Sequence, residues 1–136
     1  MKKRNSIHKV LMICIIILIA SYHQATAQRK KLRIARLEIY PEYLEAYNTA
    51  LAEHAKTAVL VEPGVLALQA VYDKTHPAQV TVFEIYAGEN AYQSHLKAAH
   101  FLKYKNSTLK MVKSLELIET EPIAIEIKPE MSRNND

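Results

Sequence analysis

The sequence predicts an α+β fold in which helices cover one face of a four-stranded antiparallel sheet. Four segments show the apolar alternation of strands, and the stretches that separate two pairs of them have helical periodicity. Their order is strand, helix, strand, strand, helix (split in two), strand, which is the split βαβ or ferredoxin-like arrangement. At 136 residues, the chain is long enough for one domain with its own core.

Each expected element follows from local periodicity and from the residues that interrupt it. Pro41 suits the first turn of a helix, and that helix ends before the turn EPG at 62–64. The short polar connection KTHPA favours a hairpin between the two middle strands. Pro122 interrupts the last strand, which therefore belongs at a sheet edge or a bend. The expected strands are 32–40, 65–73, 79–87 and 115–127, and the expected helical stretches are 41–60, 88–97 and 100–113.

Residues 1–27 have the pattern of a cleaved export signal. A basic start leads to the apolar block VLMICIIILIA at 10–20 and then to ATA at 25–27, so we expect cleavage between Ala27 and Gln28. The apolar block is well short of the roughly 20 residues that span a bilayer, which favours cleavage over a retained membrane anchor. We expect a secreted, periplasmic protein with a linker at 28–31, a domain at 32–127 and a polar tail at 128–136.

Removing this leader changes what composition implies. The leader holds four of the 18 Lys and Arg residues and no acid, so the mature chain, with 14 acidic residues, is formally neutral. The composition therefore gives no support for a nucleic-acid partner or for binding to an anionic membrane. The one cysteine, Cys14, also lies in the leader, which excludes disulfides, thiol catalysis and thiolate metal sites from the mature chain.

The predicted sheet has helices on one face only. Its other face carries apolar residues from several strands, and a bare apolar face favours association. We therefore expect a homodimer packed sheet to sheet.

Two segments carry a resemblance to a known family. EPGVLALQAVYD at 62–73 and FEIYAGENAYQSHLKAAHF at 83–101 resemble the antibiotic biosynthesis monooxygenase domain, in particular its quinol monooxygenase-like members. The resemblance covers about residues 32–122 and implies a dimeric α+β barrel of two ferredoxin-like units. It also implies oxidation of a small aromatic substrate, a quinol or electron-rich phenol, by O2 without a bound cofactor.

The sequence departs from that family pattern in places that limit its function. Ala99 stands where many members have proline before the histidine, and the absence of tryptophan disfavours tryptophan-dependent variants. In the related haem-degrading branch the haem-ligating histidine would fall near Lys105, so haem degradation is a minor alternative. A non-catalytic module that binds a small hydrophobic or aromatic molecule in the same cavity is the main competing interpretation.

Three residues are our candidates for proton transfer: His54, Glu84 and His95. His54 shares a helix face with apolar residues, and an imidazole there is a suitable general base near neutral pH. Glu84 has apolar and aromatic neighbours on its strand, so we expect either an ion-pair partner such as Arg36 or a raised pKa. For each of the three, an ordinary packing or pairing role is an open alternative.

Four further residues are candidates for binding the substrate: Arg36, Tyr72, Tyr86 and His100. Arg36 could hold a quinolate oxygen, and the tyrosines could line the cavity. His100 could instead fix the start of its helix. We expect no metal site, because His95 and His100 would point about 140° apart on a continuous helix. A helix break near 98–99 would change that geometry.

Overall fold

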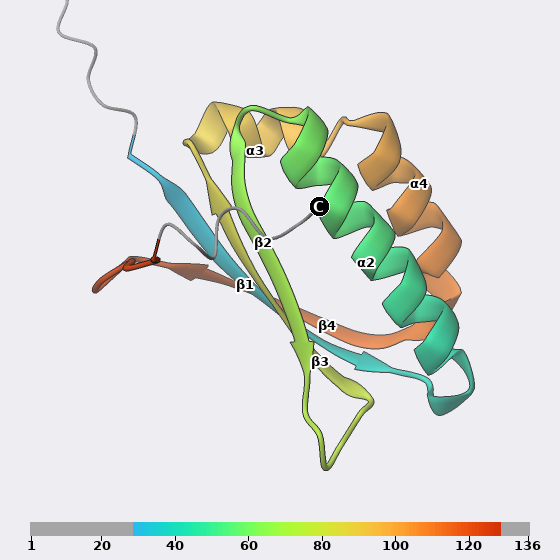
Figure 1. The fold of residues 1–136 in the computed structure, drawn as a ribbon. Helices are drawn as coiled ribbons and strands as arrows, with labels where there is room; N and C mark the ends of the chain where they lie inside the picture. The colour runs from blue at the N-terminus through green and yellow to red at the C-terminus, as the bar shows by residue number, and fades with distance from the viewer. Residues whose placement is uncertain (1–28, 129–136) are drawn as a thin grey trace, which may run out of the picture.

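The computed structural model describes residues 29–128 (Figure 1). The predicted leader, its cleavage site and all but the first residue of the predicted polar tail lie outside these residues and stay predictions. Within the described part of the chain, no helix combines the length and the apolar character needed to cross a membrane.

The structure confirms the predicted fold class. Its strands form one antiparallel sheet in the order β2-β3-β1-β4, and Figure 1 shows the helices together on one face of that sheet. The strands are β1 (Lys31–Ile39), β2 (Val65–Tyr72), β3 (Gln79–Tyr86) and β4 (Val112–Thr120). The α-helices are α2 (Leu44–Val61), α3 (Glu89–His95) and α4 (Ala99–Thr108), and the 3-10 turns are η1 (Pro41–Tyr43) and η2 (Leu109–Met111).

The end of the domain differs from the prediction. The last strand was expected at 115–127, but β4 begins three residues earlier and ends before Pro122. Proline has no N–H to donate to a sheet ladder, so the strand ends before it instead of bending through it. The preceding helix is correspondingly shorter than the predicted 100–113 stretch.

The hydrophobic core lies between α2 and the central strands. Buried residues recur on α2 every three or four positions, so the helix turns one continuous stripe toward the sheet. The polar His54 belongs to this buried stripe, which places an imidazole on the inner side of α2. The main core cluster contains Ala35, Leu37, Ile39, Tyr47, Leu51, Val80 and Val82.

Strand alternation decides which side chains of β1 reach the helices. Arg33 is buried together with Ala35 and Leu37, and it lies opposite Glu84 in the β1–β3 register. Successive side chains of a strand point to opposite faces, so Arg36 lies on the face away from the helices. That face also carries apolar residues on several strands, and the expected homodimer stays a prediction. These apolar residues are Leu32, Ile34, Phe83, Ile85 and Ile118.

A close approach at Gly64 fixes α3 against the turn that follows α2. A Cβ at Gly64 would lie 2.5 Å from the Cβ of Ala91, which is closer than two carbon atoms can pack. The Gly64 carbonyl also accepts a hydrogen bond from the N–H of Ala87 at 2.8 Å. Because α3 ends at His95, this contact helps to place that histidine.

We predict that Gly64→Ala lowers the free energy of unfolding by about 1–3 kcal/mol, because the added methyl overpacks this contact. Chemical denaturation measures the change. Gly88→Ala is the matched control, since Gly88 has an extended backbone (φ 168°) that alanine can adopt. Adding Ala91→Gly should recover part of the loss, and equal stability of Gly64→Ala and wild type would contradict the prediction.

Candidate functional site

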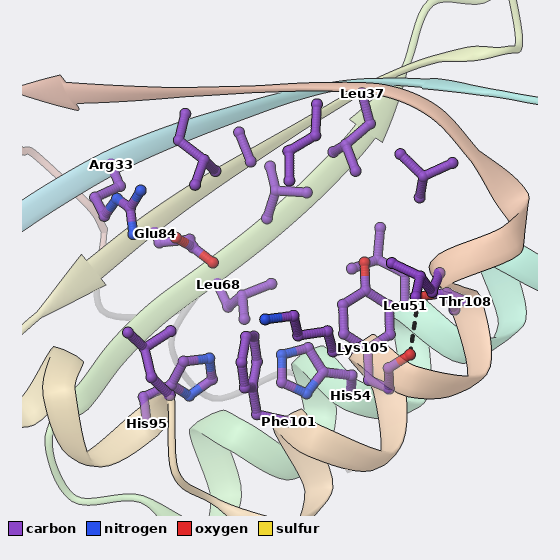
Figure 2. Close-up of a pocket in the computed structure, with 18 of the residues that line it drawn as sticks. Arg33, Leu37, Leu51, His54, Leu68, Glu84, His95, Phe101, Lys105 and Thr108 are labelled. Carbon is purple, nitrogen blue, oxygen red and sulfur yellow. Dashed lines mark hydrogen bonds between the residues drawn. The ribbon is translucent and has the colours of Figure 1, made fainter.

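A cavity of about 570 Å³ lies between the sheet and the helices. Figure 2 shows Arg33 and Glu84 projecting into it from the strands, with His95, Phe101 and His54 on the helical side. Most of the wall is aliphatic or aromatic, so polar groups are few and lie at particular places. The apolar part of the wall includes Ala35, Leu37, Leu51, Leu68, Val82, Leu96, Phe101, Leu115 and Leu117.

Glu62 contacts two histidines, His95 of α3 and His100 of α4, and His100 in turn contacts His54 of α2. Glu62 is the C-cap residue of α2, and its Oε1 lies 2.7 Å from His95 Nδ1. His100 Nε2 lies 2.8 Å from the same oxygen, although it is not aligned for a hydrogen bond. His100 Nδ1 lies 3.3 Å from His54 Nδ1. The cluster therefore runs from His95 through Glu62 and His100 to His54.

The Glu62 contact determines how His95 meets the cavity. An ionised carboxylate can only accept hydrogen bonds, so His95 donates from Nδ1, and the neutral form of this imidazole has its lone pair on Nε2. The His95 side chain is 1% exposed and lines the cavity, and Nε2 has no hydrogen-bond partner within residues 29–128. A buried imidazole oriented by a carboxylate, with its other nitrogen available, is the usual arrangement of a general base.

His54 has a different electrostatic environment. Its burial, followed by the charges of His95 and His100, lowers its pKa from 6.5 to about 4. The ring stacks on Tyr104 with centroids 4.6 Å apart, and the Tyr104 hydroxyl lies 2.7 Å from the Tyr47 hydroxyl. His54 is thus a neutral side chain at neutral pH, held between α2 and α4.

Glu84 and its neighbours form the strand side of the site. Burial raises the pKa of Glu84, against the opposing effects of the His95 and Arg33 charges. Arg33 contacts the hydroxyl of Tyr92, and its Nε lies 3.2 Å from a carboxylate oxygen of Glu119. This arrangement puts a carboxyl group with increased proton affinity within the cavity wall, close to a fixed cation.

The structure brings some of the predicted residues together and separates others. His54, Glu84, His95 and Tyr86 all line the cavity, and burial raises the pKa of Tyr86. Their chemical roles stay predictions. His100 does not line the cavity and instead contacts Glu62 and His54.

Two of the predicted binding residues lie elsewhere. Of the alternatives for Glu84, the raised pKa is found and the pairing with Arg36 is not, because Arg36 lies on the other face of the sheet, 3.6 Å from Glu116. Tyr72 is 56% exposed at the end of β2 and does not line the cavity.

Sequence reasoning missed two residues of this site. We interpreted Glu62 only as part of the turn EPG. A carboxylate at the end of a helix could also have indicated that a polar side chain lies beside it. Arg33 lies on the same face of β1 as Ala35 and Leu37. The alternation of the strand could therefore have identified Arg33, and not Arg36, as the arginine that faces the cavity. Within residues 29–128, no group of three or more His, Cys, Asp or Glu side chains is arranged to hold a metal ion.

We predict that the depressed pKa of His54 makes stability depend on pH between about 6.5 and 4. The unfolded state binds more protons than the folded state in this window, so stability falls as the pH is lowered through it. Between pH 7 and pH 4, wild type should lose about 3 kcal/mol more than His54→Gln. Urea denaturation of both proteins across this range measures the difference, and parallel curves would rule out the effect.

Comparison with known proteins agrees with this fold. The family model for antibiotic biosynthesis monooxygenase matches residues 32–107. A crystal structure of a "putative antibiotic biosynthesis monooxygenase" from Bacteroides thetaiotaomicron is 47% identical, with a TM-score of 0.71 over 74% of this chain and 95% of that chain. No curated protein matches the chain.

Two more distant structures share the architecture. A "putative monooxygenase" from Lactobacillus acidophilus is 26% identical, with a TM-score of 0.64 over 66% of this chain and 43% of that chain. A "putative antibiotic biosynthesis monooxygenase" from Nitrosomonas europaea is 15% identical, with a TM-score of 0.65 over 69% of this chain and 99% of that chain, and shows the fold alone. Together with the family match, the Bacteroides structure supports a monooxygenase-like role. This chain belongs to the antibiotic biosynthesis monooxygenase family.

Proposed function

We propose that this protein is a cofactor-independent monooxygenase that oxidises a quinol or an electron-rich phenol with molecular oxygen. One observation carries the proposal: His95 lines a largely apolar cavity, its Nδ1 is held by Glu62, and its buried Nε2 has no hydrogen-bond partner within residues 29–128. Membership of the monooxygenase family supports it independently.

The reaction needs a base more than it needs a cofactor. Removing the hydroxyl proton turns a quinol or phenol into a strong electron donor, which can transfer an electron to O2. Recombination at an unsubstituted ring carbon gives a hydroperoxide, and loss of water leaves a carbonyl. A quinol and one O2 thus become a hydroxyquinone and one water, with all four electrons supplied by the substrate. The protein has to accept the first proton and protect the anion from water.

His95 is the proposed proton acceptor. Its Nε2 takes the hydroxyl proton of the bound substrate, and the Glu62 carboxylate stabilises the imidazolium that forms. Glu62 also lies 2.8 Å from His100, whose side chain is 18% exposed compared with 1% for His95. We propose that the His95 imidazolium returns this proton to the substrate peroxide, which becomes the hydroperoxide that loses water, so that no net proton leaves the site.

The other cavity residues complete the proposed mechanism. Glu84, with its raised pKa, retains a proton to higher pH than an ordinary glutamate and can donate a hydrogen bond to a substrate oxygen. His54 stays neutral, so it adds a polar edge to the cavity without a second positive charge beside the imidazolium. The aliphatic and aromatic wall excludes water from the reacting anion.

A binding module without turnover is the competing function. The same cavity could hold a small aromatic molecule, and the oriented histidine would then be a hydrogen-bond acceptor for its hydroxyl. Oxygen consumption distinguishes the two functions, because only an enzyme accelerates it above the rate of quinol autoxidation.

We predict that His95→Gln lowers the rate of quinol-dependent oxygen consumption about 100-fold or more, because glutamine cannot accept the proton. Glu62→Gln should lower it by about tenfold or more, because the imidazole loses its orienting charge. An oxygen electrode measures both rates with metal-stripped protein.

His76→Gln is the matched control, because His76 is an exposed residue of the β2–β3 hairpin. It should retain the wild-type rate. Folding of each variant is checked by circular dichroism. Wild-type rates in well-folded His95→Gln would remove His95 from the mechanism, and quinol binding without oxygen consumption by wild type would favour the binding module.

A further inference from the structure

The cavity has an open side that differs in charge from its buried end. Most lining residues in η2 and on β4 are exposed, whereas those on the inner face of α2 and on β3 are mostly buried. Leu109, Leu115 and Leu117 are between 52% and 71% exposed at this opening. A ligand bound against His95 would therefore have its outer end near α4 and β4.

Lys105 is an exposed residue of α4 whose side chain has no carboxylate partner among the described residues. It lines the cavity, and Figure 2 shows it extending from α4 with its amino group on the side of Phe101 and Leu68. The other two cations of the described cavity wall are paired. Arg33 contacts Glu119, and Lys113 lies 2.7 Å from Glu38. No carboxylate within residues 29–128 pairs with Lys105.

The charge balance of the wall favours a ligand with a negative group. Glu84 is the one acidic side chain lining the cavity in the described part of the chain, whereas Arg33, Lys105 and Lys113 are cationic. A carboxylate on the ligand would be attracted to Lys105, the cation of the described wall that has no carboxylate partner. The phenolic end of a ligand held in this way is free to lie against His95.

We infer that the substrate is an aromatic quinol or phenol bearing a carboxylate, and that Lys105 binds this carboxylate while His95 faces the hydroxyl. The inference rests on the proposed function and adds to it a substrate class and a specificity-determining residue. Lys105 takes no part in the proton transfer, so its removal should alter the choice of ligand more than the chemistry of a neutral quinol.

The test compares two naphthols that differ in one substituent, 6-hydroxy-2-naphthoate and 6-(hydroxymethyl)-2-naphthol. Dissociation constants are measured without oxygen at pH 7.5 by isothermal titration calorimetry. Wild type should bind the carboxylate about five- to tenfold more tightly than the neutral compound, which is the expected range for a partly exposed ion pair. The ratio should fall with added salt.

In Lys105→Gln this ratio should fall to about one, with the affinity for the neutral compound unchanged. Lys103→Gln is the matched control on the same helix, because Lys103 pairs with Glu53 at 2.9 Å and does not line the cavity. It should keep the wild-type ratio.

Three outcomes would overturn the inference: a ratio near one in wild type, a wild-type ratio in Lys105→Gln, or loss of the ratio only in Lys113→Gln. In each of these cases the proposed function is still supported if wild type binds the neutral naphthol, oxidises a neutral quinol, and loses this oxidation in His95→Gln. Failure of wild type to bind either naphthol would count against the aromatic cavity and therefore against both proposals.

Discussion

The contact between Glu62 and His95 is the interaction on which the rest of the site depends. The main chain fixes Glu62 on both sides, since its N–H donates to the Ala58 carbonyl and its carbonyl accepts from the Val65 N–H, each at 3.0 Å. The carboxylate is therefore positioned by the end of α2 and the start of β2, the framework of the fold. One of its oxygens then meets His95 from α3 and His100 from α4. A residue at the end of α2 thereby contacts side chains from the two other α-helices.

The break between α3 and α4 makes this convergence possible. On a continuous helix, two residues five apart point about 140° from each other and cannot contact one oxygen atom. Here α3 ends at His95, Ala98 is extended with ψ 138°, and α4 begins at Ala99. The two imidazoles consequently approach the same carboxylate from different helices. One carboxylate oxygen therefore lies beside both a fully buried imidazole, His95, and a partly exposed one, His100.

The sequence predicted the fold well because hydrophobic periodicity depends mainly on local spacing. The structure has the predicted alternation on β1 and the predicted buried stripe on α2. The last strand alone differs clearly from its predicted bounds, because it ends before Pro122 instead of continuing through it. The placement of His54, Glu84 and His95 in one cavity also agrees with their predicted faces. The ionic partners were not predictable in the same way, because Arg33–Glu119 and Glu62–His95 join residues far apart in the chain. Arg36 was predicted to bind the substrate in the cavity, but it has the opposite orientation to Arg33 on β1, so its side chain lies on the other face of the sheet.

The central claim is that His95 carries its proton on Nδ1, toward Glu62, and offers an unprotonated Nε2 to the cavity. Nitrogen NMR of uniformly ¹⁵N-labelled histidines distinguishes the two tautomers directly, with His95 assigned by comparison with His95→Gln. Across pH 7 to 9 we predict the Nδ1–H tautomer for neutral His95 in wild type, and its loss or mixing with the other tautomer in Glu62→Gln. An Nε2–H tautomer in wild type, or an imidazolium that persists to pH 9, would contradict the account.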